Sequence, residues 1–192
     1  MNDKKVFTIS NFISAFRLLF LIPIFFFLKQ DSPTGNLWAV FFMVWAIITD
    51  IVDGYLARKL NQVSYWGKII DPVSDKVCVA AVIIFLAFIP REVKIPIWFV
   101  ALVLGRDMVI LSANILAIRL KNAVGTSNKI GQSTAIILAL VIVLYTLKWE
   151  PYCLIIMWIG VAMIVISLIS YFKVFLNIME SPAGKEEMIA KD

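Results

Sequence analysis

The sequence predicts an all-α integral membrane protein with six transmembrane helices and an interfacial helix at its N-terminus. The first observation is composition: of 192 residues, 61% are hydrophobic and 16% are charged, and the mean hydropathy is +0.92. Soluble domains are typically about half apolar and about a quarter charged. The second is that long apolar runs recur along the chain, and the third is that turn-forming residues separate them.

The apolar runs have the length of membrane spans, since a helix needs about 20 mostly apolar residues to cross a bilayer. The breaks between them contain prolines, glycines and asparagines that are typical of turns. Short connections predict a single membrane domain over residues 1–192, with a charged tail at 178–192. The predicted spans are Phe12–Leu28, Leu37–Ala57, Ile69–Ile89, Ile95–Ile118, Ile130–Leu147 and Tyr152–Leu176.

The segment from Thr8 to Arg17 mixes polar and apolar residues at helical spacing, which predicts an amphipathic helix along the membrane surface. Lysine and arginine then predict the orientation, because cytoplasmic connections are enriched in both. Only Lys29, Arg91, Lys94 and Lys148 fall on the side opposite the N-terminus. The N-terminal side, predicted to be cytoplasmic together with both termini, carries Lys4, Lys5, Arg17, Arg58, Lys59, Lys68, Arg119, Lys121, Lys129, Lys173, Lys185 and Lys191.

The residue inventory limits the chemistry. The sequence contains no histidine, so acid–base or nucleophilic steps must use carboxylate, lysine, tyrosine or cysteine. Cys78 and Cys153 lie far apart in apolar runs, and we interpret both as packing residues.

Four aspartates interrupt otherwise apolar helices. Asp50 and Asp53 are near the end of the second predicted span, and Asp71 and Asp75 are near the start of the third. Spacings of three and four residues put each pair on one helix face. Because the connection between the two helices is short, we expect all four carboxylates to converge at the cytoplasmic end of this helix pair.

Four carboxylates at close range repel one another, and divalent cations such as Mg²⁺ or Mn²⁺ would remove that repulsion. Two alternatives use the same aspartates. They could cap helices or form salt bridges with neighbouring cations such as Arg58 and Lys68. They could also belong to a divalent cation transporter, although ion sites in transporters tend to lie near the bilayer midplane.

One pattern of fixed residues joins the two helices: Asp50-x₂-Asp53-Gly54-x₂-Ala57-Arg58-x₈-Gly67-x₃-Asp71-x₃-Asp75. It resembles the signature of the CDP-alcohol phosphatidyltransferases, with every fixed position present. The resemblance implies six spanning helices with an N-terminal interfacial helix. It also implies transfer of a phosphatidyl group from CDP-diacylglycerol to an alcohol, in the cytoplasmic membrane of a bacterium. Membrane lipids and a second copy in a homodimer are implied partners, and no nucleic acid is expected.

The resemblance implies a role for each motif residue. Two divalent ions, Mg²⁺ or Mn²⁺, would be held by the four aspartates, and Asp75 would also deprotonate the acceptor hydroxyl. The implied contacts to the CDP-lipid donor are Asn11, Gly54, Ala57, Arg58, Ser64 and Gly67, although the residue before Asn11 is Ser10, where the family usually has proline.

The acceptor is less well determined. Members of the family that use glycerol-3-phosphate have a Gly-Arg-Glu stretch in the fourth helix, which Gly105-Arg106-Asp107 resembles. Two cations expected in such members are replaced here by Asn114 and Gln132. The same region is similar to cardiolipin synthases of this family, whose acceptor is phosphatidylglycerol. We predict glycerol-3-phosphate, with phosphatidylglycerol as the alternative, and acceptor contacts from Arg106, Arg119, Lys121 and Lys129.

Overall fold

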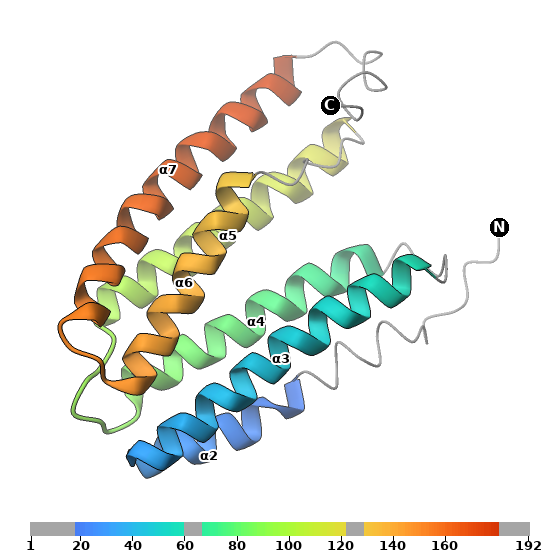
Figure 1. Cartoon of the computed structure of the whole chain (residues 1–192). Helices are drawn as coiled ribbons and strands as arrows, with labels where there is room; N and C mark the ends of the chain where they lie inside the picture. The colour runs from blue at the N-terminus through green and yellow to red at the C-terminus, as the bar shows by residue number, and fades with distance from the viewer. Residues whose placement is uncertain (1–17, 60–66, 122–128, 181–192) are drawn as a thin grey trace. The chain divides into compact units, whose positions relative to one another are not determined.

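The computed structural model describes residues 18–59, 67–121 and 129–180, and α-helix is the only regular secondary structure within them (Figure 1). The predicted all-α class is therefore confirmed. The chain separates into unit 1, residues 1–97 and 142–149, and unit 2, residues 98–141 and 150–192, which we describe one at a time. The helices are α2 (Leu21–Gln30), α3 (Pro33–Lys59), α4 (Gly67–Phe88), α5 (Ile97–Lys121), α6 (Lys129–Leu147) and α7 (Tyr152–Glu180).

From α4 onward the helices follow the predicted spans closely. The first span was predicted as Phe12–Leu28, whereas α2 begins only at Leu21, and residues 12–17 lie outside the described residues. The start of α3 also differs. We predicted a turn through Gly35 and a span from Leu37, but only Asp31 and Ser32 separate α2 from α3. Ser32 is the N-cap: its Oγ accepts the Gly35 N–H at 3.0 Å and its carbonyl accepts the Asn36 N–H at 2.8 Å. Pro33 takes the first helical position, where a missing N–H costs little. The predicted interfacial helix lies outside the described residues.

Membrane character is visible in two ways. Among the described residues, two helical segments are long and apolar enough to span a bilayer, Lys129–Leu147 of α6 and Tyr152–Leu176 of α7. Large apolar side chains such as Phe26, Ile136 and Trp158 also have more than half of their surface exposed. Soluble proteins rarely expose so much apolar surface. The chain is therefore a membrane protein, while six spans stay a prediction.

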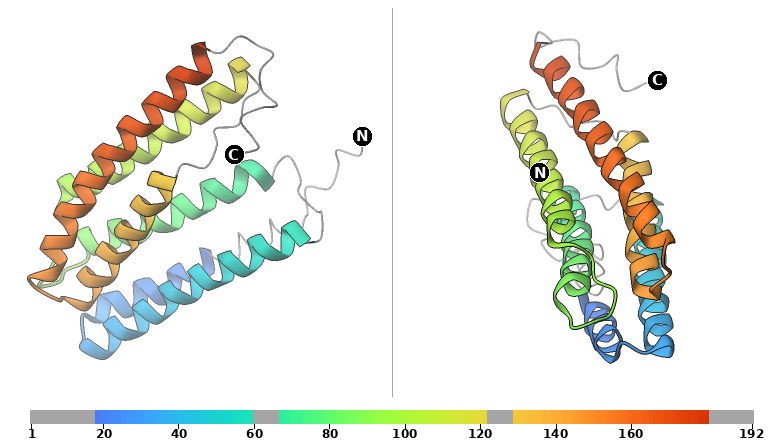
Figure 2. Two further views of the ribbon diagram at one scale, coloured as in Figure 1. Left: turned by 45° about the horizontal axis from the view of Figure 1, so that its top comes forward. Right: turned by 90° about the vertical axis from the view of Figure 1, so that its left-hand side faces the viewer.

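Unit 1 is organised by α2, which packs on both α3 and α4. The Phe27 ring of α2 stacks on Phe42 of α3 with centroids 5.8 Å apart, and Phe25 meets Phe85 of α4 edge-on at 4.8 Å. Figures 1 and 2 show the C-terminal end of α3 and the N-terminal end of α4 together at one end of unit 1. The end of α2 and the start of α3 lie at the opposite end.

Unit 2 contains nearly all of α5, the first part of α6, and α7. An added Cβ at Gly160 of α7 would lie 3.6 Å from both Phe99 of α5 and Val141 of α6, which is ordinary packing contact. A Cβ at Gly131 of α6 would lie only 2.8 Å from the Tyr171 hydroxyl of α7. Glycine at position 131 therefore lets the tyrosine hydroxyl lie against the α6 backbone. One face of α7 is thus packed against its neighbours in this unit.

The two cysteines are consistent with packing roles. Cys153 is buried, Cys78 is half-buried, and neither forms a disulfide.

Candidate functional site

The four predicted metal-binding aspartates lie on the two helices that meet at one end of unit 1. Asp50 and Asp53 belong to α3, and Asp71 and Asp75 belong to α4. Because both segments are helical, spacings of three and four residues do place each pair on one helix face. Their side chains lie outside the part of the chain that the structure describes, so their convergence stays a prediction.

The chemistry of this donor set fits divalent cations. Carboxylate oxygens are the hard ligands that Mg²⁺ and Mn²⁺ prefer, and the two helical pairs supply four of them at the joined ends of α3 and α4. Among the side chains that the structure describes, no three His, Cys, Asp or Glu residues gather into another group that could hold a metal.

The other predicted donor contacts divide into two sets. Gly54, Ala57 and Arg58 are in the last turns of α3, and Gly67 is the first residue of α4. All of them are therefore on the same two helix ends as the aspartates. Asn11 and Ser64 lie outside the described residues.

Arg106 is the predicted acceptor contact that the structure describes in most detail. It is the tenth residue of α5 and is buried, with 7% of its surface exposed. Its Nη1 donates to Asp107 Oδ1 at 2.7 Å, and its Nη2 donates to Ser167 Oγ of α7 at 2.9 Å. Its Nε is buried without a hydrogen-bond partner. Arg106, Asp107 and Ser167, which we call the Arg106 cluster, all belong to unit 2.

The remaining predicted acceptor contacts lie at helix ends in unit 2. Arg119 and Lys121 are in the last turn of α5, and their side chains lie outside the described set. Lys129 is the first residue of α6 and is exposed. Three of the predicted cations are thus near helix ends, whereas Arg106 lies within α5.

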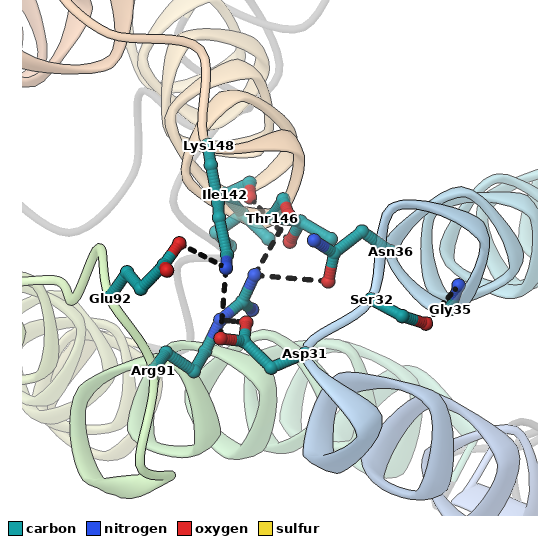
Figure 3. A network of polar contacts seen from close by, with 9 residues as sticks. All are labelled: Asp31, Ser32, Gly35, Asn36, Arg91, Glu92, Ile142, Thr146 and Lys148. Atoms are coloured by element: carbon teal, nitrogen blue, oxygen red, sulfur yellow. Dashed lines mark hydrogen bonds and ion pairs between the residues drawn. The ribbon is translucent and has the colours of Figure 1, made fainter.

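A second buried arginine organises the opposite end of unit 1 (Figure 3). Arg91 follows α4, and its side chain is completely buried. Its Nη2 donates to Asn36 Oδ1 at 3.1 Å and to the Thr146 main-chain oxygen at 2.8 Å. Its Nε lies 3.2 Å from Asp31 Oδ1, an ion pair without the direction of a hydrogen bond. These contacts, which we call the Arg91 network, therefore join the segments that follow α2 and α4 to α3 and to the last turn of α6.

Lys148 completes the Arg91 network. Its Nζ donates to Asp31 Oδ2 at 2.8 Å and to Glu92 Oε2 at 2.9 Å. The hydrogen bond to Asp31 raises the pKa of Lys148 above its ordinary value, against the opposing effect of burial. Burial lowers the pKa of Arg91, and the Asp31 carboxylate opposes that effect. With two acids and two bases, the network is electrically balanced.

The ion pair between Asp31 and Lys148 links two helix ends of the same kind. Both residues are left-handed, with φ of 48° and 57°, and each follows the end of a helix. The Lys148 N–H donates to the Tyr145 carbonyl and the Trp149 N–H to the Leu144 carbonyl, which is the Schellman arrangement. Glycine usually occupies that position. In this protein Asp31 and Lys148 occupy the left-handed positions after α2 and α6, and their side chains form an ion pair.

Sequence reasoning missed Ser167 and the Arg91 network. Ser167 is one of two serines, with Ser170, in an apolar run and belongs to no motif. Arg91 and Lys148 were interpreted only as two of the few cations on the non-cytoplasmic side. The one usable signal was the pair of charged residues, Asp31 and Lys148, placed where helices end.

The sequence profile of the CDP-alcohol phosphatidyltransferase family matches residues 7–166, and the chain belongs to this family. The predicted enzyme class is therefore confirmed, and the cation transporter alternative is set aside. Enzymes of this family generally use divalent metal ions.

Relatives carry two different names. The CDP-diacylglycerol–glycerol-3-phosphate 3-phosphatidyltransferase of Bacillus subtilis (strain 168) is 28% identical over 186 residues, covering 87% of this chain and 94% of the relative. A relative of the same name from Aquifex aeolicus is 34% identical over 113 residues, covering 59% of this chain and 61% of the relative. The cardiolipin synthase (CMP-forming) of Streptomyces coelicolor is 31% identical over 115 residues, covering 58% of this chain and 52% of the relative.

Proposed function

We propose that this chain transfers the phosphatidyl group of CDP-diacylglycerol to glycerol-3-phosphate, giving phosphatidylglycerophosphate and CMP. The observation that carries the proposal is the similarity to the Bacillus subtilis relative, which extends over 94% of that protein. The buried cation Arg106 supports it, because a guanidinium is a strong donor to a phosphate.

The donor half of the reaction is assigned to the motif helices. Asp50, Asp53, Asp71 and Asp75 hold two Mg²⁺ or Mn²⁺ ions, which neutralise the donor diphosphate when bound. Residues that contact the CDP-lipid are Asn11, Gly54, Ala57, Arg58, Ser64 and Gly67. The support is the complete family motif together with the helical backbone at both aspartate pairs.

Asp75 accepts the proton of the acceptor hydroxyl. The acceptor oxygen then attacks the lipid-side phosphorus in line, and CMP leaves. A carboxylate base is compatible with the absence of histidine from the sequence, and the family motif supports Asp75 for this role. An Asp75→Asn variant should lose turnover and retain CDP-diacylglycerol binding, and undiminished turnover would rule Asp75 out as the base.

The acceptor half is assigned to cations of unit 2. Arg106 binds the phosphate of glycerol-3-phosphate, with Arg119, Lys121 and Lys129 as further contacts. Arg106 is supported by its place in the Gly105-Arg106-Asp107 stretch. It is also buried, and its Nε has no hydrogen-bond partner.

The cellular setting follows from the family and from charge. We place the protein in the cytoplasmic membrane of a bacterium, as a single domain of six spanning helices preceded by an interfacial helix. Both termini and the catalytic aspartates face the cytoplasm, which the distribution of lysine and arginine supports. A homodimer among membrane lipids is the proposed assembly.

A second acceptor, phosphatidylglycerol, is favoured by two specific observations. Asn114 and Gln132 replace cations expected for glycerol-3-phosphate, and the Streptomyces coelicolor relative is a cardiolipin synthase. Transfer to phosphatidylglycerol would give cardiolipin and CMP.

The deciding experiment is an acceptor panel with the purified full-length protein. CMP release from CDP-diacylglycerol is measured with glycerol-3-phosphate or with phosphatidylglycerol, and the lipid product is identified by mass. We expect phosphatidylglycerophosphate from the first acceptor. Cardiolipin alone would replace the main proposal with the alternative, and no CMP release with either acceptor would contradict both.

The metal assignment has its own test. Chelation should abolish CMP release, and separate additions of Mg²⁺ and Mn²⁺ should show which ion restores it. Asp53→Ala should remove the metal dependence of CDP-diacylglycerol binding. Binding that still responds to metal in this variant would contradict the role of Asp53.

A further inference from the structure

The surroundings of Arg106 contain a polar contact that the family motif does not explain. A charged side chain within an apolar helix is costly unless it is paired, and Arg106 has two partners of different character. Asp107 is a carboxylate that balances the charge, at 2.7 Å, and Ser167 is a neutral hydroxyl at 2.9 Å. Both lie in unit 2, and Ser167 is completely buried.

Ser167 differs from other helical hydroxyl groups of the described chain in this contact. Ser112, Thr134 and Thr146 donate to the carbonyl four residues earlier, at 2.7–2.8 Å. Such bonds satisfy the hydroxyl within its own helix. The Ser167 Oγ instead accepts a hydrogen bond from another helix, from the guanidinium of Arg106.

The two partners affect the guanidinium differently. The Asp107 carboxylate competes with any anion that approaches Arg106, because it already balances the positive charge. The Ser167 hydroxyl accepts a hydrogen bond without contributing a charge, so it orients the planar group without adding to the competition from Asp107. The Nε of Arg106, buried and without a hydrogen-bond partner, is a donor that remains for a phosphate oxygen.

The position of Ser167 is well fixed. It lies inside α7, Tyr152–Glu180, between Ile164, which is completely buried, and Tyr171, whose hydroxyl lies against Gly131 of α6. These residues recur at intervals of three and four and therefore share one face of α7. A hydroxyl on this packed face can hold the guanidinium in one orientation.

We propose that Ser167 is a positioning residue for the acceptor: its hydroxyl orients the Arg106 guanidinium to receive the acceptor phosphate. The inference rests on the proposed function, in which Arg106 binds that phosphate. It identifies α7, which carries no motif residue, as part of the basis for acceptor recognition.

The test is a double-mutant cycle of Ser167→Ala and Arg106→Lys in the full-length protein. The KM is measured for CDP-diacylglycerol and for whichever phosphate-bearing acceptor the wild type uses, glycerol-3-phosphate or phosphatidylglycerol. We expect Ser167→Ala to raise the acceptor KM about tenfold, which corresponds to about 1.4 kcal/mol. The donor KM should be unchanged. In the Arg106→Lys background, Ser167→Ala should raise the acceptor KM little further, because the planar guanidinium that the Ser167 hydroxyl orients is absent.

Thr134→Val is the matched control, because it also removes a completely buried hydroxyl from a helix of unit 2. Thr134 Oγ1 contacts the carbonyls of Ile130 and Met163 and does not contact Arg106. The Thr134→Val variant should lower thermal stability about as much as Ser167→Ala and should leave the acceptor KM unchanged.

Several results would overturn the inference: an unchanged acceptor KM in Ser167→Ala, an equal rise in Thr134→Val, or fully additive effects of the two substitutions in the cycle. An active wild type with any of these results leaves the proposed function standing. A wild type that uses neither acceptor overturns the proposed function and this inference together.

Discussion

Each unit of the molecule holds a buried arginine, and the two are surrounded in different ways. Arg91 contacts three separate segments, and one of its partners, Asp31, also pairs with Lys148. Arg106 contacts its neighbour in sequence, Asp107, and one hydroxyl on another helix. The first arrangement links parts of unit 1 that are far apart in sequence. The second orients a side chain within unit 2 and links α5 to α7.

This difference indicates a division of roles. A buried charge with a carboxylate and two carbonyl-type acceptors around it gains cohesion from every contact, and losing it leaves several groups unsatisfied. Arg106 contacts a single hydroxyl and an adjacent carboxylate and links fewer segments, so its loss should cost less stability. Both arginines keep donors without a hydrogen-bond partner, Nε and Nη1 of Arg91 and Nε of Arg106, and of the two it is Arg106 that lies in the Gly105-Arg106-Asp107 stretch. We therefore expect Arg91 substitutions to affect folding stability and Arg106 substitutions to affect acceptor use.

The largest effect is expected from Arg91→Met. It leaves Asp31 without its buried partner and removes the donor to Asn36 and Thr146. Breaking a buried pair in this way typically costs about 3–5 kcal/mol, so the thermal unfolding midpoint in detergent should fall by about 10 °C. Lys94→Met, which removes an exposed cation from the same connection, should change it little. Equal midpoints for the two variants would contradict a stabilising role for Arg91.

The sharpest test of the comparison is a pair of lysine substitutions, Arg91→Lys and Arg106→Lys. Both keep a positive charge and remove the planar fork, so each isolates geometry from charge. Arg106→Lys should raise the acceptor KM about tenfold, which is about 1.4 kcal/mol, with a smaller loss of stability. Arg91→Lys should lower the unfolding midpoint and leave both KM values unchanged. The reverse pattern would show that the two roles are interchanged.

Apolar patterning was enough to predict the described helices, because each apolar run between turn-forming residues contains one helix. The sixth span was predicted to begin at Tyr152, where α7 does begin. The start of α3 was missed because Ser32-Pro33 was interpreted as part of a turn, although serine followed by proline is also a helix-start signal.

The candidate site was only partly predictable, for a different reason. A motif predicts which residues act together on two adjacent helices, here Asp50, Asp53, Asp71 and Asp75, and their roles stay predictions. The Arg91 network and Ser167 depend on contacts between distant segments, and Lys148 pairs with Asp31 across 117 positions. No local pattern in the sequence encodes such a pairing, so only the structure brings these residues together.

A smaller effect is expected at Lys148, where the left-handed backbone lowers the stability of the fold and the ion pair with Asp31 raises it. Lysine at φ 57° is strained by about 1 kcal/mol, and glycine is not. Lys148→Gly and Lys148→Ala both remove the contacts to Asp31 and Glu92, so their difference isolates the backbone. We expect the glycine variant to be more stable by about 1 kcal/mol in chemical unfolding. Lys94 does not have a left-handed backbone, so Lys94→Gly should not be more stable than Lys94→Ala. An alanine variant as stable as the glycine variant would contradict the strain.

The smallest effect is a loss of stability in alkali. Since the pKa of Lys148 is raised by its hydrogen bond to Asp31, its contribution is complete below the pKa of unfolded lysine, about 10.4. It disappears as the pH rises through the higher pKa of the folded state. The unfolding midpoints of the wild type and Lys148→Met should therefore differ by a constant amount between about pH 7 and 9 and converge above about pH 10.5. We expect about 0.5 kcal/mol to be lost, because the pair is partly exposed and screened. A difference that persists into strong alkali would mean that Lys148 stabilises unit 1 through its packing and that its charge is not needed, so that the ion pair between Arg91 and Asp31 would carry the electrostatic stabilisation.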